Sequence, residues 1–122
     1  MNRQEFTILQ HTLDDVRLHL EQAAREAGVV LEFLMRRWNG RFATYNIGRP
    51  GVRGSGRRPY RVVGRIKFNT HPDGTLHAVL SPPTACDPNP TPDDEAAYRA
   101  FWRAFRARLD GHIFVKDNGE PN

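Results

Sequence analysis

Residues 60–81 constrain the fold more than any other segment, because two alternating runs flank a short turn sequence. The runs YRVVGRIKFN and TLHAVLS lie on either side of THPDG, a pattern typical of a β-hairpin. A five-residue loop over 70–74 pairs Asn69 with Thr75 and gathers the apolar side chains on one face. The pairs expected on that face are Phe68–Leu76, Ile66–Ala78 and Gly64–Leu80. The residues expected on the other face are Arg61, Val63, Arg65 and Lys67, opposite Ser81, Val79 and His77.

A second hairpin is expected over residues 29–47. The run VVLEFLMRRW at 29–38 alternates as a strand would, although LEFLMRRW also suits a helix. Asn39-Gly40 favours the hairpin, because this dipeptide is a strong turn signal between two periodic runs. The following run, RFATYNI at 41–47, predicts a strand with two distinct sides. Phe42, Thr44 and Asn46 lie on one side, and Ala43, Tyr45 and Ile47 lie on the other.

Two helices and two short segments near the ends of the chain complete the expected elements. Residues 12–27 predict a helix that begins at the N-cap Thr12 and ends before Gly28. Residues 92–109 predict a second helix, because Thr91-Pro92 followed by three acids is a strong helix start. A weaker pattern at 5–10 suits a short strand or an extra helical turn, and residues 112–116 could add an edge strand.

These elements predict an α+β fold in the order (β)-α-β-β-β-β-α-(β). An antiparallel sheet of about four strands, with two helices packed on one face, buries both apolar stripes and leaves the other sheet face in water. We expect one compact domain over residues 1–122. A basic Gly/Pro-rich loop at 48–59, a Pro-rich connector at 82–91 and a frayed tail at 117–122 would lie outside the regular elements.

Composition excludes several classes of protein. A chain of 122 residues with 39% hydrophobic and 26% charged residues is too apolar for a wholly disordered protein and has no run of about 20 apolar residues to span a bilayer. The N-terminus lacks the apolar core of a secretory signal, and the single cysteine, Cys86, excludes an internal disulfide. We therefore expect a cytoplasmic protein without membrane contact.

Positive charge gathers in the middle of the chain. Residues 1–28 hold three Arg and five acids, a charge of −2, and residues 70–122 hold five bases and eight acids, a charge of −3. Residues 29–69 hold nine Arg, one Lys and one Glu, a charge of +9. A segment of this kind is the usual footprint of a polyanion partner, although a solvated sheet face beside a basic loop would share it.

The candidate binding residues follow from this segment. Arginine grips phosphate with a planar fork, and aromatic rings offer stacking faces to bases. The residues expected to meet nucleic acid or another polyanion are Arg49, Arg53, Arg57, Arg58, Arg61, Arg65, Lys67, Tyr60 and His77. With about one phosphate for each cation, the log–log salt slope of binding would be about −4 to −6.

The leading hypothesis is a small non-enzymatic module that binds RNA or DNA. The alternative is an interaction module, an adaptor or an inhibitor of a nucleic-acid-handling or defence complex, whose basic patch meets an acidic protein surface. A third hypothesis is a small RNase-type toxin in which His77 or His71 acts beside Arg65 as general acid or base. The chain contains no P-loop, dinucleotide-binding or zinc-site motif, so we expect no cofactor and no metal.

The second predicted helix carries a large aromatic stripe. Tyr98, Phe101, Trp102 and Phe105 recur at helical spacing and are most simply core residues. For so short a chain the stripe is large, so Tyr98 and Trp102 are also candidates for a homodimer or partner interface.

Overall fold

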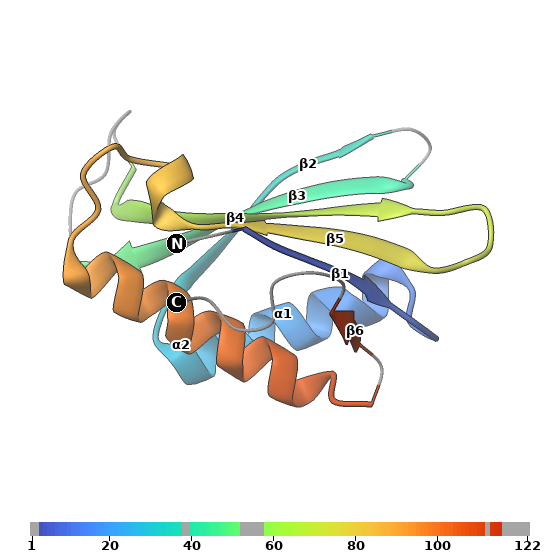
Figure 1. Ribbon diagram of the computed structural model, residues 1–122. Coiled ribbons are helices and arrows are strands. Elements are labelled where there is room, and N and C mark those ends of the chain that lie inside the picture. Colours follow the sequence, from blue (N-terminus) through green and yellow to red (C-terminus); the bar gives the residue numbers. More distant parts are fainter. Residues whose placement is uncertain (1–2, 38–39, 52–57, 112, 116–122) are drawn as a thin grey trace.

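The computed structural model describes residues 3–37, 40–51, 58–111 and 113–115. The elements, in chain order, are β1 (Gln4–Ile8), α1 (Leu13–Ala27), β2 (Val30–Arg37), β3 (Phe42–Pro50), β4 (Tyr60–Thr70), β5 (Leu76–Ser81), the 3-10 helix η2 (Pro83–Ala85), α2 (Pro92–Arg108) and β6 (Ile113–Val115). The sheet has the order β2-β3-β4-β5-β1-β6, and both helices lie on one side of it (Figure 1). The predicted fold class is confirmed, and the two short segments add β1 and β6 to the four predicted strands β2, β3, β4 and β5.

Both helices begin with the local chemistry that the sequence predicts. The Thr12 side chain accepts from the backbone of Asp15, whose own side chain accepts from the backbone of Thr12, and Thr91 and Asp94 form the same capping box at α2. Such boxes satisfy amide groups that the first helical turn leaves unpaired. Gly28 ends α1 with φ of 69°, a left-handed conformation that glycine adopts without steric cost.

The core lies between the sheet and the helices. The Phe6 ring of β1 packs against Trp102 of α2 with 5.0 Å between ring centroids, and both side chains are fully buried. Tyr98 is also fully buried, and its hydroxyl donates to the Leu80 carbonyl at 3.3 Å. Tyr98 and Trp102 are therefore core residues in this structure, and neither offers a surface to a partner.

The β4–β5 hairpin forms, but its register differs from the prediction. Thr70 pairs with Leu76, and Phe68 pairs with Ala78, so each β4 residue lies opposite a partner two positions further along β5 than expected. The loop is five residues long, as predicted, but runs from His71 to Thr75. A shift of two residues preserves the faces of both strands, because side chains alternate with a period of two.

The β3–β4 pair contains an irregularity that the sequence analysis missed. Ile47 pairs with Gly64, whereas Gly48 pairs with Val62, so Val63 is an extra residue on β4. Such a β-bulge shifts the alternation of the strand by one residue. Val63 is fully buried. The side chains of β4 residues 60–62, which precede the bulge, point to the sheet faces opposite to those that the sequence predicts.

The segment expected to be a loop at 48–59 is partly regular. Residues 48–50 continue β3 and pair with residues 60–62 of β4, so the prediction of a loop was wrong for them. Residues 52–57 lie outside the described residues, as does the predicted tail at 117–122. The connector at 82–91 contains the single 3-10 turn η2.

Candidate functional site

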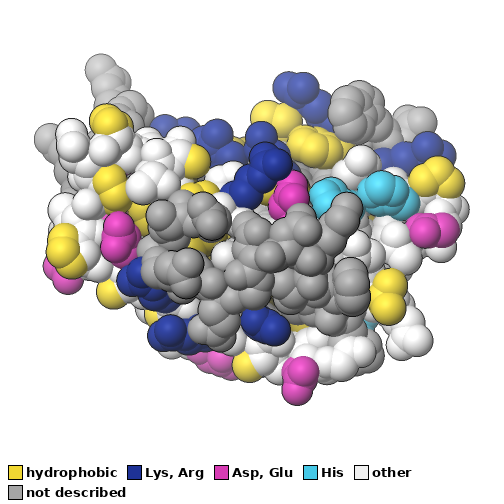
Figure 2. Space-filling view, in the orientation of Figure 1, with side chains coloured by type: hydrophobic (Ala, Val, Ile, Leu, Met, Phe, Trp, Pro, Cys, Tyr) yellow, Lys and Arg dark blue, Asp and Glu magenta, His cyan; other side chains and the backbone are white. Residues whose placement is uncertain are grey.

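The sheet face away from the helices, here called the outer face, presents aligned rows of side chains. Strand register places Met35, Thr44 and Lys67 in one row. The next row toward the hairpin loops holds Arg37, Phe42 and Asn69, and the row on the other side holds Glu32, Asn46 and Arg65. Figure 2 shows many of the Lys and Arg side chains along the sheet side of the molecule, at the top of the view.

A concave site of about 380 Å³ lies on this face across β2, β3 and β4. We call it the outer basic hollow, and its lining residues are Leu34, Met35, Arg37, Phe42, Thr44, Arg65 and Lys67. Three of these residues are cationic, three are apolar and none is acidic. A concave surface lined by one sign of charge concentrates ligands of the opposite sign.

A second β-bulge shapes this hollow. The β2–β3 register shifts between Phe33 and Met35, which makes Leu34 the extra residue. Leu31 and Phe33 of β2 face α1, whereas Met35 faces outward. The alternation predicted for 29–38 puts Met35 on the same face as Leu31 and Phe33. That prediction was wrong for Met35, because the bulge shifts the alternation by one residue.

The three cations of the hollow differ in how firmly they are held. The Arg65 Nε donates a hydrogen bond to Asn46 Oδ1 at 3.0 Å. Arg37 and Lys67 are exposed, and within the described part of the chain no carboxylate lies within 4.0 Å of either side chain. These two charges are available to a ligand, and Arg65 is available with its orientation fixed.

A polar cluster around Glu32 borders the hollow. The Tyr60 hydroxyl and the Asn46 amide both donate hydrogen bonds to Glu32 Oε1, and the Arg58 Nε lies 3.5 Å from the same oxygen. The hydrogen bond from Tyr60 holds the pKa of Glu32 below its ordinary value, so Glu32 is ionised at neutral pH and partly neutralises Arg58. Tyr60 is 4% exposed, which corrects its predicted role as a stacking face.

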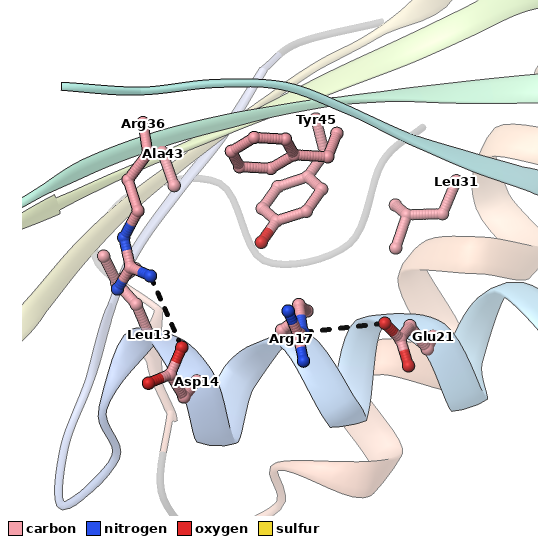
Figure 3. A pocket seen from close by; sticks show the side chains of 9 residues that line it. Leu13, Asp14, Arg17, Glu21, Leu31, Arg36, Ala43 and Tyr45 are labelled. Carbon is pink, nitrogen blue, oxygen red and sulfur yellow. Dashed lines mark hydrogen bonds and ion pairs between the residues drawn. The ribbon is translucent and has the colours of Figure 1, made fainter. Parts of the chain in front are cut away.

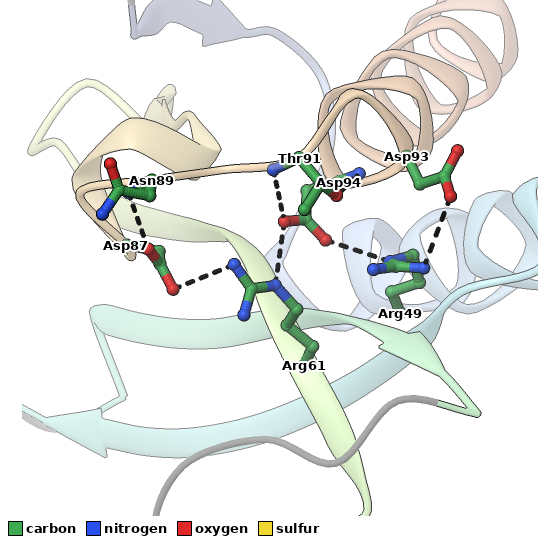
Figure 4. Close-up of polar contacts among 7 residues, drawn as sticks. All are labelled: Arg49, Arg61, Asp87, Asn89, Thr91, Asp93 and Asp94. Atoms are coloured by element: carbon green, nitrogen blue, oxygen red, sulfur yellow. Dashed lines mark hydrogen bonds and ion pairs between the residues drawn. The ribbon is translucent and has the colours of Figure 1, made fainter.

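Arg49 and Arg61 occupy a different environment on the helix side of the sheet. Their Nε atoms donate to the two carboxylate oxygens of Asp94, at 3.0 Å and 2.8 Å respectively. Arg61 also donates to Asp87 at 2.9 Å, and Arg49 lies 4.0 Å from Asp93 (Figure 4). We call these five residues the Asp94 cluster. The prediction that Arg61 shares a face with Arg65 and Lys67 was wrong, because the bulge at Val63 turns Arg61 toward α2.

The Asp94 cluster holds its charges firmly. The Asp94 side chain is 2% exposed. Burial alone would raise the Asp94 pKa, but hydrogen bonds from the Thr91 backbone, Arg61, the Thr91 hydroxyl and Arg49 outweigh burial and lower it. The hydrogen bond to Asp94 is the main cause that raises the pKa of Arg61. The cluster therefore ties β3 and β4 to the start of α2.

The remaining predicted residues are placed as follows. Arg53 and Arg57 lie outside the described residues. His77 pairs with Asn69 rather than with Lys67. Asn69 is four residues along β4 from Arg65, or about 13 Å. The His71 and His77 rings lie 5.7 Å apart near the hairpin loop. The register therefore places His77 further from Arg65 along the sheet than the sequence predicts.

A second hollow, of about 350 Å³, lies on the other side of the β2 edge, against α1. Phe33 and Tyr45 form its aromatic wall, with 5.4 Å between ring centroids. The charged residues at its rim form ion pairs with one another. Arg36 lies 3.4 Å from Asp14, and Arg17 lies 3.6 Å from Glu21 (Figure 3). This hollow therefore lacks the excess of positive charge found in the outer basic hollow.

Five residues that line the outer basic hollow beside the predicted cations were not predicted from sequence. Arg37 contributes to the charge of the middle segment but was not among the predicted site residues, and neither were Leu34, Met35, Phe42 and Thr44. The available signal for Arg37 and Phe42 was the Asn39-Gly40 turn, since a tight hairpin places the residues flanking its loop opposite each other.

No protein-family model, no curated protein and no solved structure matches this chain. Over the residues that the structure describes, no helix is long and apolar enough to cross a membrane. In the same residues, no three or more His, Cys, Asp or Glu side chains are grouped so as to hold a metal ion. The chemistry of the outer basic hollow is therefore the main guide to function.

Proposed function

We propose that this protein is a non-enzymatic module that binds nucleic acid through the outer basic hollow. The observation that carries the proposal is the convergence of Arg37, Arg65 and Lys67, from two strands, around a concave surface whose described lining residues include no acid. Nucleic acid matches this chemistry, because its phosphates supply a dense row of negative charges and release counterions when cations replace them.

The Asp94 cluster limits how many cations take part. Arg49 and Arg61 already satisfy buried carboxylate oxygens, so a phosphate would have to displace a partner that is held in place. Three phosphate contacts from the outer basic hollow give a log–log salt slope of about −3 on duplex DNA and about −2 on single strands. This slope counts only the three cations of the hollow and is shallower than the slope of about −4 to −6 expected for the seven cations predicted from sequence. Of those seven, Arg53 and Arg57 lie outside the described residues.

Fluorescence anisotropy tests the proposal with labelled single- and double-stranded DNA and RNA, at salt concentrations from about 50 to about 200 mM. The variant Arg37→Ala/Arg65→Ala/Lys67→Ala removes the three cations of the hollow. The matched control Arg17→Ala/Arg25→Ala/Arg99→Ala removes the same charge from the helices. We expect the first variant to lose roughly a hundredfold in affinity at low salt, at about 1 kcal/mol or less for each contact, and the control to lose little.

Three outcomes overturn the proposal. One is the absence of salt-dependent binding to any of the four nucleic acids, which would favour the alternative of an acidic protein surface as partner. Another is an equal loss of affinity in both triple variants, which would make net charge rather than the hollow responsible. The third is cleavage of any probe that His77→Ala abolishes, which would make the protein a nuclease rather than a binding module.

A further inference from the structure

We propose that the outer basic hollow seats an unpaired base, so that the nucleic acid bound by this face is single-stranded. This inference rests on the proposed function, because it concerns the same site. It starts from the apolar part of the hollow, which cations alone do not explain. Leu34, Met35 and Phe42 line the hollow and are all partly exposed.

A duplex and a single strand would use these apolar residues differently. A duplex turns its phosphates and sugars outward and keeps its bases stacked inside, so it would contact the cations and leave Leu34, Met35 and Phe42 facing water or backbone. A single strand exposes the flat faces of its bases. Base faces pack on apolar and aromatic side chains in sequence-tolerant binding sites, where cations track the backbone beside them.

The strand order gives the hollow a suitable layout. Arg37 lies on β2, and Arg65 and Lys67 lie on β4, with the Phe42 and Thr44 positions of β3 between them. Neighbouring strands are about 4.8 Å apart, so the two cationic strands are separated by roughly 10 Å. Phosphates can therefore be held on both sides of an apolar floor. The volume of about 380 Å³ falls in the range of sites that hold small organic groups.

The bulge at Leu34 provides part of this floor. In a regular strand, Met35 would share the helix-facing side with Phe33. The extra residue places both Leu34 and Met35 on the lining of the outer basic hollow. Bulges that redirect side chains in this way are frequent beside functional sites.

The test compares probes that carry the same phosphates with and without bases. The probes are labelled oligo-dT and oligo-rU of about 12 nucleotides, an abasic strand of the same length and a blunt duplex of the same length. At matched salt, we expect the better of the two single strands to bind roughly tenfold or more tightly than the abasic strand and than the duplex. The variant Leu34→Ser/Met35→Ser should remove most of this preference while leaving the salt slope unchanged.

The matched control is Phe33→Ser, which removes an exposed apolar side chain from the opposite face of β2 and should leave the base preference intact. Circular dichroism melting checks that each variant is folded. Equal affinity for oligonucleotides with and without bases, or tighter binding of the duplex, overturns this inference and leaves nucleic-acid binding standing. Failure to bind any probe overturns both proposals.

Discussion

Arg61 and Arg65 lie four residues apart on β4 and have opposite environments. Arg61 bonds to the buried carboxylate of Asp94 and to Asp87 on the helix side, whereas Arg65 lines the outer basic hollow. In a regular strand the two side chains would share a face. The bulge at Val63 separates them, so one arginine stabilises the fold and the other is available to a ligand. Equal formal charge therefore does not imply equal function.

The largest effect is expected at the centre of the Asp94 cluster. Asp94→Asn leaves two guanidinium groups without their carboxylate, so we expect the free energy of unfolding at pH 7 to fall by about 2–3 kcal/mol. The measurement is urea unfolding followed by circular dichroism. The control Asp93→Asn changes a neighbouring carboxylate that is 83% exposed and should alter stability by about 0.5 kcal/mol or less.

The pH dependence of the same variant gives a second check. The pKa of Asp94 lies below its ordinary value of 3.8, so the ionised carboxylate stabilises the fold fully above that value. This contribution is lost as the pH falls through the folded-state pKa. The stability difference between the natural protein and Asp94→Asn should therefore be constant near neutrality and shrink below about pH 4. A difference that persists at the lowest pH where both proteins fold would contradict this account.

The next largest effect is expected at Gly48, beside the β-bulge at Val63. A Cβ atom at Gly48 would lie 2.0 Å from the Tyr60 ring, whose hydroxyl is bound to Glu32. We expect Gly48→Ala to destabilise the protein by about 1–3 kcal/mol, because the ring must move. In a double-mutant cycle with Tyr60→Ala, the two losses should sum to more than the loss of the double variant. Strict additivity would show that the ring does not require the glycine.

The bulges explain which parts of the site were predictable from sequence. The alternation of Phe42, Thr44 and Asn46 against Ala43, Tyr45 and Ile47 predicts both faces of β3 correctly, because that segment contains no extra residue. On β4 the same reasoning places Arg65 and Lys67 correctly and fails at Arg61. Counting alternate residues assumes an unbroken strand. Gly48 and Gly64 lie within predicted strands or beside them, and glycine at such positions often indicates a β-bulge.

The register of the β4–β5 hairpin shows a second limit. An apolar pattern with a period of two fits registers that differ by two residues equally well, so the pattern predicted the faces but not the pairs. The selected register has Thr75 donating from its backbone and its hydroxyl to Asp73 Oδ1, at 2.9 Å and 2.7 Å. Such a turn depends on side-chain hydrogen bonds rather than on the apolar pattern. The expected position of His77 was wrong for this reason.

A smaller effect is expected from Arg61→Ala. The variant removes one of two arginines from Asp94, so we expect a loss of about 1–2 kcal/mol in the free energy of unfolding. The salt slope of nucleic-acid binding should not change, because Arg61 faces α2 rather than the outer basic hollow. Urea unfolding and anisotropy titrations on the same preparation measure both quantities. A shallower salt slope would place Arg61 in the binding surface.

The smallest effect on stability is expected from Arg37→Ala, which should nevertheless reduce the salt dependence of binding. Arg37→Ala removes an exposed cation that has no described carboxylate within 4.0 Å, so the free energy of unfolding should change by about 0.5 kcal/mol or less. The magnitude of the salt slope should fall by about 1, as expected for one lost phosphate contact.

The neighbouring residue supplies a control with the same charge on the same strand. Arg36 faces α1, where it lies 3.4 Å from Asp14, and Arg36→Ala should leave the salt slope unchanged. If both substitutions reduce the slope equally, binding follows the net charge of the chain and not the outer basic hollow. If Arg37→Ala alone reduces it, the face on which an arginine lies decides its function, even for two adjacent residues.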